Sequence, residues 1–245
     1  MLQYIAMNKN KIAIATITRA RNAQEEKELS QSLETLAALN IPVFITDAGS
    51  IPSFINFLQS IPHFFLSKEP VEGVYAQAKN SLLAAYETNV DYIFYTEPDK
   101  GAFFRNSLLN MLDAIEENEQ LGIMMASRSQ PGFATFPSFQ QMTETTINNC
   151  CAEVMGKKTD YCYGPFLLNK KLVPYIDFIK EDIGWGWRPY LFAMAHCLGY
   201  KVEAFEKDFL CPQHQRDDDA KERIYRMKQL EENIRGLVLS TQVKL

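Results

Sequence analysis

Two acidic residues, Glu97 and Asp99, follow the apolar segment DYIFYT and are separated by Pro98. A buried carboxylate is costly unless it is paired or binds a cation, so two acids at the end of a buried strand need a reason. One reason is that the strand reaches solvent there and the acids face water. The other is a divalent-cation site, because such ions bind through one or two carboxylates together with substrate phosphates. Pro98 would stiffen the turn between the two ligands.

The segments around this acidic pair alternate between strand and helix patterns. Short β-branched or aromatic runs predict strands at 11–17, 41–46, 61–67, 91–96 and 121–128, and helical spacing predicts helices at 23–40, 71–88 and 104–120. Parallel neighbouring strands need a crossover connection, usually a helix. The alternation therefore indicates an α/β fold with a mostly parallel central sheet flanked by helices.

Polar residues follow three of the predicted strands directly. In a sheet of this kind, ligands bind outside the carboxyl ends of the strands. We therefore expect these side chains to gather at one edge of the sheet: Thr16, Thr18, Arg19 and Arg21 after the first strand, Asp47 after the second, and Glu97 with Asp99 after the fourth.

The second half of the chain is less regular. We expect a Pro/Phe loop at 131–141, then a helix through Met155, a strand over 159–169 interrupted at Gly164-Pro165, a helix at 184–200 after a Gly/Trp turn, and a last strand at 201–207. Residues 217–240 predict an N-capped helix whose mixed charges face solvent. No linker or internal repeat interrupts the sequence, which favours a single domain over residues 1–245.

Composition excludes several classes of protein. The formal net charge of −5 over 245 residues argues against a general nucleic-acid binder, which needs a basic face. Five cysteines with no Cys-x-x-Cys pair suit free thiols in a reducing compartment. We see no signal peptide and no stretch that approaches a membrane span, so the expected location is cytoplasmic.

Taken in order, several segments resemble GT-A glycosyltransferases. They are TDAGS (46–50), AKN (78–80), TEPDKG (96–101), ASR (126–128), YGPFLLNKKLV (163–173) and GWGWRPYLFAMAHCLGYKVEAF (184–205). TEPDKG resembles the family's Asp-x-Asp motif, with Glu in the first place. The resemblance covers roughly residues 11–215 and rests on the order and position of the motifs at strand ends. It implies the GT-A fold, with a nucleotide-sugar-binding half at about 1–128, an acceptor-binding half at about 129–215 and a C-terminal helix at 216–245.

The resemblance implies a metal-dependent transfer of a sugar from a UDP- or GDP-sugar to a small-molecule or glycan acceptor. Mn²⁺ or Mg²⁺ would be held by Glu97 and Asp99, with His214 as a third ligand or as an exposed loop residue. Asp47 would accept a hydrogen bond from the nucleobase, or would only stabilise its own turn. The expected donor-binding residues are Thr16, Arg19, Arg21, Asp47, Lys79, Glu97 and Pro98.

The acceptor would lie against Tyr163, Gly164, Trp185, Trp187 and Arg188. The two tryptophans could form a platform for a sugar ring or pack in the core, and Arg188 could hold an acidic acceptor group. Many inverting relatives place a general base just after the Gly-aromatic turn, where this chain has Arg188, Pro189 and Tyr190. Either Asp182 substitutes, or no protein base is used, as in retaining relatives, or the protein is inactive. Retention is the favoured reading, with Asp99, Asp182 and Arg188 as the expected catalytic residues.

Two other functions remain open. The missing base motivates a non-catalytic sugar-nucleotide or glycan-binding protein on the same fold. A nucleotidyltransferase ranks lower, because such proteins carry a Gly-rich loop after the first strand and TITRARNAQ contains no glycine.

Overall fold

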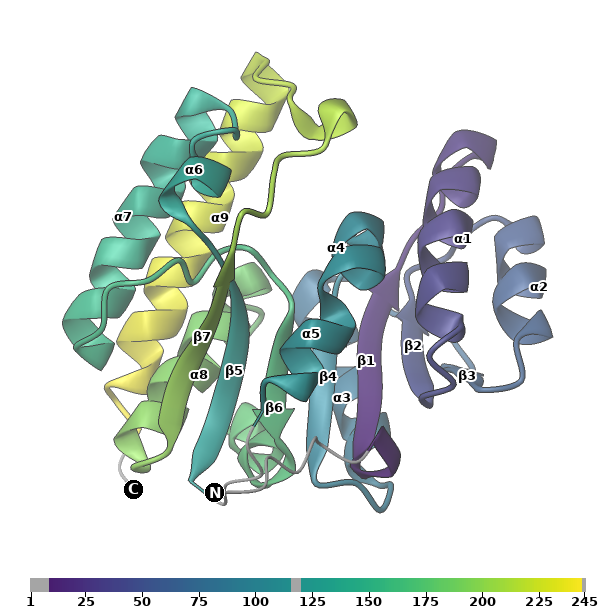
Figure 1. Cartoon of the computed structure of the whole chain (residues 1–245), viewed down its shortest axis with the longest axis horizontal. Helices are drawn as coiled ribbons and strands as arrows, with labels where there is room; N and C mark the ends of the chain where they lie inside the picture. The colour runs from purple at the N-terminus through teal and green to yellow at the C-terminus, as the bar shows by residue number, and fades with distance from the viewer. Residues whose placement is uncertain (1–8, 116–119, 244–245) are drawn as a thin grey trace. The chain divides into compact units, whose positions relative to one another are not determined.

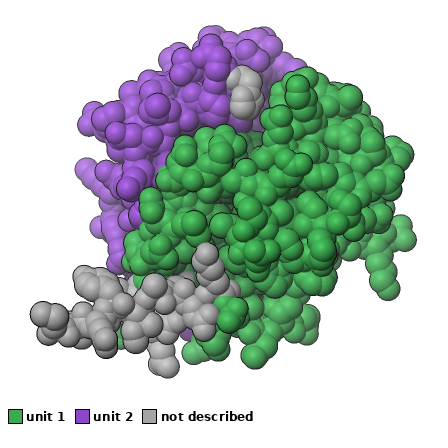
Figure 2. Space-filling view, turned by 45° about the vertical axis from the view of Figure 1, so that its right-hand side comes forward, with its two compact units in different colours: residues 1–121, 165–173 green, residues 122–164, 174–245 purple. Residues whose placement is uncertain are grey.

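The computed structural model describes residues 9–115 and 120–243, and the side chains of Lys9 and His214 lie outside this description. The chain forms two compact units (Figure 2). Unit 1 contains residues 1–121 and 165–173, and unit 2 contains residues 122–164 and 174–245. The chain therefore leaves unit 1, builds part of unit 2 and returns once.

Unit 1 is built on a sheet with the strand order β3-β2-β1-β4-β6. Its strands are β1 (Ile12–Thr18), β2 (Val43–Asp47), β3 (Phe64–Leu66), β4 (Tyr92–Thr96) and β6 (Phe166–Asn169). β1 runs parallel to β2 and β4, β2 runs parallel to β3, and β6 pairs antiparallel with β4. Every residue of β1 is buried, as expected for a central strand covered on both faces. The predicted mostly parallel sheet is confirmed.

Helices pack on this sheet (Figure 1). They are α1 (Ala23–Ala37), α2 (Pro52–Ser60), α3 (Val74–Tyr86), α4 (Gly101–Asn106) and α5 (Leu108–Asp113), after a short 3₁₀ turn η1 (Lys9–Lys11). α3 packs on β1 and β2, while α1 packs against α4 and α2. Asn22 caps α1 by accepting hydrogen bonds from the backbone N–H groups of Gln24 and Glu25. This cap ends the loop after β1, so that the polar residues there stay close to the strand end.

The helices of unit 1 differ from the prediction at two places. The single helix expected over 104–120 is broken at Ser107 into α4 and α5, and residues 116–119 lie outside the description. Ser107 has φ −141°, ψ −26°, which is not helical, although its N–H still bonds to the carbonyl of Phe103. Helix α2 was not predicted, although Pro52 at its first position is a common start signal.

Unit 2 contains strands β5 (Leu121–Arg128) and β7 (Lys201–Lys207), which are neighbours. Its helices are α6 (Gln130–Phe133), α7 (Ser138–Met155), α8 (Trp187–Cys197) and α9 (Ala220–Ser240), with 3₁₀ turns η3 (Gly184–Gly186) and η4 (Gln213–Gln215). A longer 3₁₀ segment, η2 (Lys170–Phe178), follows β6. α9 packs along α7 and α8 (Figure 1). The helix through Met155, the helix after the Gly/Trp turn and the strand at 201–207 are confirmed.

Two other predictions in unit 2 are wrong. Residues 159–165 form no strand. The Asp160 N–H donates to the Ser127 hydroxyl, and its side chain accepts from the Cys162 N–H, so this backbone is not available for strand pairing. Only Phe166–Asn169 pairs as a strand. The C-terminal helix is capped by Asp219 as expected, but it is not solvated on all sides. Its second half buries Glu232, Asn233 and Leu237.

The described residues contain no helix that could cross a bilayer. All five cysteines are free thiols, as the sequence predicted.

Candidate functional site

The carboxyl ends of three adjacent strands in unit 1 meet, as the sequence predicted. Thr18 of β1 lies opposite Asp47 of β2, and Thr16 lies opposite Thr96 of β4. The Thr16 hydroxyl donates to the Thr96 carbonyl oxygen at 2.8 Å, which ties β1 to β4 beside Glu97. We refer to Thr16, Thr18, Asp47, Thr96, Glu97 and Asp99 as the strand-end cluster.

Asp47 of this cluster accepts four hydrogen bonds from its own chain. Its Oδ1 accepts from the backbone N–H groups of Gly49 at 2.8 Å and Ser50 at 2.7 Å. Its Oδ2 accepts from the hydroxyls of Thr18 at 2.8 Å and Ser50 at 2.5 Å. The residue is 3% exposed. A carboxylate has about four acceptor positions, so Asp47 is filled by its own chain and fits the turn-stabilising alternative.

Gln77 of α3 reaches across the ends of β1 and β2. Its Nε2 donates to the carbonyl oxygens of Thr46 at 3.1 Å and Thr18 at 3.3 Å. No sequence motif singles out Gln77, because a glutamine inside a helix has no characteristic pattern around it. The contact becomes visible only when α3 is packed on the sheet.

Glu97 and Asp99 differ in environment. Glu97 is 9% exposed and directly follows β4, and the Thr96 hydroxyl donates to its carbonyl oxygen at 3.1 Å. Asp99 lies at the surface, where its two carboxylate oxygens are 3.4 and 3.5 Å from Lys100 Nζ. Within the described residues, no group of three or more His, Cys, Asp or Glu side chains could hold a metal by itself. Two carboxylates still fit Mg²⁺ or Mn²⁺, since these ions complete their coordination with water and substrate phosphates.

The three cations expected beside the donor have different surroundings. Arg19 is exposed and Lys79 is partly buried on α3. Arg21 is exposed and bonds to Glu25, with Nη2 to Oε1 at 2.5 Å and Nε to both carboxylate oxygens at 3.0 Å. The hydrogen bond from Arg21 holds the pKa of Glu25 below its ordinary value. Arg21 therefore has an internal partner at the start of α1.

In unit 2, the expected acceptor residues are divided between surface and core. Trp185 is partly exposed, and its indole N–H donates to the Tyr225 hydroxyl at 2.9 Å. The Arg188 guanidinium carbon lies 4.7 Å from the centre of the Trp185 ring. Trp187 is 0% exposed, so the core-packing alternative holds for this residue and an acceptor platform does not.

The remaining predicted acceptor and catalytic residues occupy loops of unit 2. Tyr163 stacks on Phe209 with ring centres 4.6 Å apart and planes at 6°. Gly164 has φ +127°, a conformation that favours glycine. Asp182 is exposed and accepts from the Gly184 N–H at 2.8 Å, which caps the turn before Trp185. The side chain of His214 lies outside the described residues.

Comparison with known proteins identifies the fold. No family model and no curated sequence matches the chain. Glucosyl-3-phosphoglycerate synthase from Mycobacterium tuberculosis, solved with Mn²⁺, UDP and phosphoglyceric acid, aligns with a TM-score of 0.61 at 12% identity and covers 96% of this chain and 80% of its own. Mannosyl-3-phosphoglycerate synthase from Rubrobacter xylanophilus aligns with a TM-score of 0.63 at 14% identity, over 95% and 76% of the two chains. The chain has the GT-A fold.

A buried polar network around Arg128 of this GT-A chain was not predicted from the sequence. Arg128 ends β5 and bonds to Asp160, with Nε to Oδ2 at 2.6 Å and Nη2 to Oδ1 at 3.0 Å. Its Nη2 also donates to Glu144 Oε2 at 2.6 Å. The only sequence signal was Arg128 in the ASR motif, because its partners come from α7 and an irregular loop.

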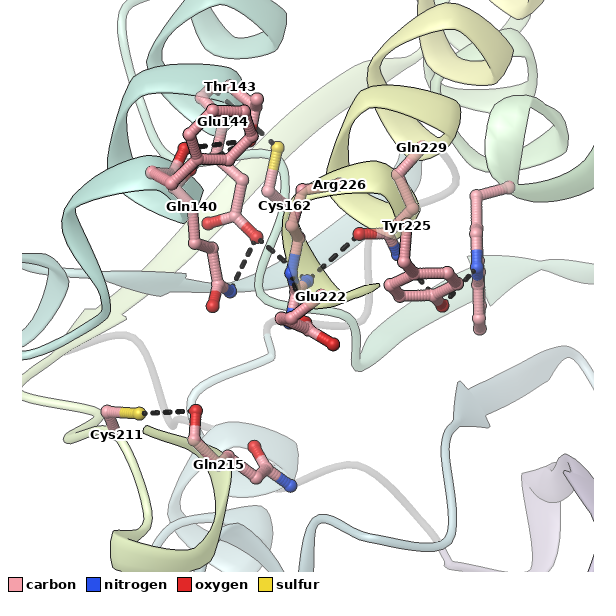
Figure 3. A network of polar contacts seen from close by, with 12 residues as sticks. Gln140, Thr143, Glu144, Cys162, Cys211, Gln215, Glu222, Tyr225, Arg226 and Gln229 are labelled. Atoms are coloured by element: carbon pink, nitrogen blue, oxygen red, sulfur yellow. Dashed lines mark hydrogen bonds and ion pairs between the residues drawn. The ribbon is translucent and has the colours of Figure 1, made fainter. Parts of the chain in front are cut away.

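Glu144 links Arg128 to α9, and Figure 3 shows the part of the network from Gln140 and Glu144 to Arg226. Glu144 accepts from Gln140 Nε2 at 2.8 Å and lies 3.8 Å from Arg226 Nη1, whose guanidinium also bonds to Gln229 Oε1 at 2.9 Å. Burial favours the neutral form of Asp160, but the charge and hydrogen bonds of Arg128 outweigh it and leave the pKa of Asp160 below 3.8. In the GT-A chain this network fixes the end of β5 to the helices of unit 2.

Proposed function

We propose that the chain is a metal-dependent glycosyltransferase that moves a sugar from a UDP- or GDP-sugar to a small acceptor. The observation that carries the proposal is the position of Glu97 and Asp99, which directly follow β4 beside the ends of β1 and β2. Ligands of such sheets bind outside the carboxyl ends of the strands. Support comes from the shared fold with enzymes solved with Mn²⁺ and UDP.

Glu97 and Asp99 would hold Mn²⁺ or Mg²⁺, with His214 as a further candidate ligand. When bound, such an ion neutralises the charge that develops on the departing diphosphate. Buried Glu97 supplies a carboxylate whose position is fixed by the end of β4. Asp99 is 3.4 Å from Lys100 Nζ and would exchange this exposed ion pair for the metal. An exposed pair of this kind contributes only about 0–1 kcal/mol, so the exchange is not costly.

The chain's own cations would hold the donor phosphates. Arg19 is exposed at the loop after β1, and Lys79 lies on α3, which packs on β1 and β2. Arg21 would have to release Glu25 to contribute, because its guanidinium is already bonded to that carboxylate. Arginine suits phosphate because it donates two parallel hydrogen bonds. We therefore rank Arg19 and Lys79 above Arg21.

For the acceptor, we propose a small molecule with an anionic group, held near Trp185, Arg188 and Tyr163. Two observations support this choice: Arg188 stacks on the partly exposed Trp185 ring, and the glucosyl-3-phosphoglycerate synthase of similar fold was solved with phosphoglyceric acid. The residues after the Gly/Trp turn, Arg188, Pro189 and Tyr190, include no acid. Asp182 already caps the turn through Gly184. Transfer with retention of configuration, in which the leaving phosphate takes the acceptor proton, is the mechanism that needs no further carboxylate.

A non-catalytic nucleotide-sugar-binding protein is the alternative function. The segment after the Gly/Trp turn favours it, since Arg188, Pro189 and Tyr190 include no acid that could take the acceptor proton. The two functions differ in whether the donor is consumed. A catalytic protein releases free sugar slowly from a UDP- or GDP-sugar when metal is present, and a binding protein does not.

Calorimetric titration with UDP and GDP, each with and without Mn²⁺, tests the proposal. We expect one nucleotide to bind only with Mn²⁺, and Asp99→Asn to weaken that binding by about tenfold or more. Asp91→Asn is the matched control, because Asp91 is another exposed acid beside β4, at its opposite end, and pairs with Lys11. Binding that is indifferent to Mn²⁺ and to Asp99 would favour the non-catalytic function. No binding of either nucleotide would reject both.

A further inference from the structure

We infer that Gln77 supplies the atom that selects the nucleobase of the donor. In this role, Gln77 Oε1 accepts a hydrogen bond from the ring N–H of uracil or guanine. The inference rests on the proposed function, since it places the donor nucleotide at the strand-end cluster. It assigns base recognition to α3 and not to the acidic turn after β2.

The amide of Gln77 is held in one orientation. Its Nε2 donates to the Thr46 carbonyl at 3.1 Å and to the Thr18 carbonyl at 3.3 Å. An amide nitrogen carries two hydrogens, so both are used. Because both partners are backbone carbonyls, which only accept, the nitrogen and oxygen of the amide cannot exchange places without losing both bonds. Oε1 is therefore the group that remains for a ligand.

No described residue donates a hydrogen bond to Gln77 Oε1. The residue is 5% exposed, and Oε1 is not one of the fully buried polar atoms that lack a partner, so this oxygen still reaches the surface. A ligand N–H could therefore bond to it without displacing a protein donor. Asp47, the alternative acceptor, already receives four hydrogen bonds from Thr18, Gly49 and Ser50. A nucleobase could bond to Asp47 only by displacing one of them.

The locked amide distinguishes between nucleobases. Uracil N3 and guanine N1 carry a hydrogen, whereas cytosine N3 and adenine N1 are acceptors and would face Oε1 with a lone pair. A site built to accept an N–H strongly rejects an analogue that lacks it, because its own polar group stays unpaired. The structure thus favours uracil and guanine nucleotides over cytosine and adenine nucleotides.

The test compares UDP with CDP and with UDP methylated at N3, by calorimetry in the presence of Mn²⁺. If GDP is the nucleotide that binds, GDP, ADP and N1-methyl-GDP replace them. For the unaltered protein we expect CDP and the methylated nucleotide to bind at least about tenfold more weakly. For Gln77→Ala we expect weaker UDP binding and little further loss on methylation. Gln140→Ala is the matched control, because Gln140 is a 7%-exposed glutamine on a helix of unit 2 that also donates through Nε2.

Three results would overturn the inference. The first is equal affinity for UDP and CDP in the unaltered protein, a measurement that needs no variant and holds even if Gln77→Ala does not fold. The second is a methylation penalty that persists undiminished in Gln77→Ala. The third is the absence of binding by UDP and GDP alike, which would reject the proposed function as well. Metal-dependent UDP binding with either of the first two results would reject only the role of Gln77.

Discussion

Gly236 of α9 and Gly186 of η3 are in direct backbone contact. A Cβ atom built on Gly236 would lie 2.0 Å from the Gly186 carbonyl oxygen, and one built on Gly186 would lie 2.1 Å from the Glu232 carbonyl oxygen. No side chain fits at either position without moving the helix or the turn. The backbone N–H of Trp185 donates to Glu232 Oε2 at 3.0 Å beside this contact. The C-terminal helix therefore supports the turn that presents Trp185 and Arg188.

Gly236→Ala tests this support. The added methyl group has no room, and overpacking typically costs about 1–3 kcal/mol. We expect a lower midpoint of urea unfolding together with altered fluorescence of Trp185. Val238→Ala is the control, since Val238 lies on the same helix and is 51% exposed. Equal stability of the two variants would show that α9 is not held against η3 in solution.

Arg128→Met should be strongly destabilising. The substitution leaves Glu144 and Asp160 buried without their cation, and breaking a buried ion pair in this way costs about 3–5 kcal/mol. Unfolding in urea at neutral pH measures the loss. A change smaller than that of an exposed control, Lys157→Met, whose ion pair with Glu203 lies at the surface, would contradict the role of the network.

The same variant should change the pH dependence of stability. In the unaltered protein the pKa of Asp160 lies below its ordinary value, so its contribution is complete above the unfolded pKa of about 3.9 and is lost as pH falls through the folded pKa. Without Arg128, burial still raises the pKa of Asp160, and only the hydrogen bonds among the causes that lower it, from Asn148 and the Cys162 N–H, remain. We therefore expect Arg128→Met to lose more stability at pH 7 than at pH 4, as measured by urea unfolding at both values.

Asp47→Asn separates turn stability from nucleotide binding. Asparagine has one acceptor oxygen where Asp47 uses two, so part of the set from Thr18, Gly49 and Ser50 is lost at a cost of about 1–3 kcal/mol. We expect a lower unfolding midpoint, with UDP affinity in Mn²⁺ changed by no more than about threefold. A tenfold loss of UDP affinity in a still folded variant would restore Asp47 as the group that binds the base.

Trp185→Phe should remove most of the solvent-sensitive fluorescence. Trp185 is partly exposed beside Arg188, whereas Trp187 is fully buried. Acrylamide should quench the unaltered protein efficiently and the variant weakly. Quenching of the variant at the level of the unaltered protein would contradict the burial of Trp187. The unaltered protein then offers a direct assay of the proposed anionic acceptor, since binding beside Arg188 would change the emission of Trp185.

The sequence was sufficient for most of the strands and for the edge where polar residues gather, although the strand expected over 159–169 is limited to β6. β5 and β7 were predicted to the residue, and the ends of β1, β2 and β4 meet as expected, because short buried strands leave a strong local pattern. Helix α2 was missed because it is only nine residues long, which leaves little room for a helical repeat, and the break at Ser107 was missed because nothing but the local backbone marks it.

The roles of individual side chains were harder to predict, because they depend on contacts between distant segments. In the TDAGS motif, the Asp47 carboxylate could be expected to bind a ligand. In the structure it already accepts four hydrogen bonds from its own chain. The sequence did not distinguish Trp185 from Trp187, although Trp185 reaches the surface and Trp187 is buried. Gln77 and Arg128 gain their partners only when the chain folds. Gln77 is 31 residues from Thr46 and 59 from Thr18, and Arg128 is 32 residues from Asp160.

The antiparallel strand β6 has a consequence for how the chain acquires its structure during synthesis. Unit 1 includes residues 165–173, which emerge from the ribosome only after the first part of unit 2. Until then the β4 edge opposite β1 is an unpaired strand edge, from Tyr92 to Tyr95, of the kind that invites pairing with other chains. A nascent chain that ends before Pro165 would therefore be prone to aggregate, and the pairing of Tyr95 with Phe166 marks the moment at which that hazard begins to end.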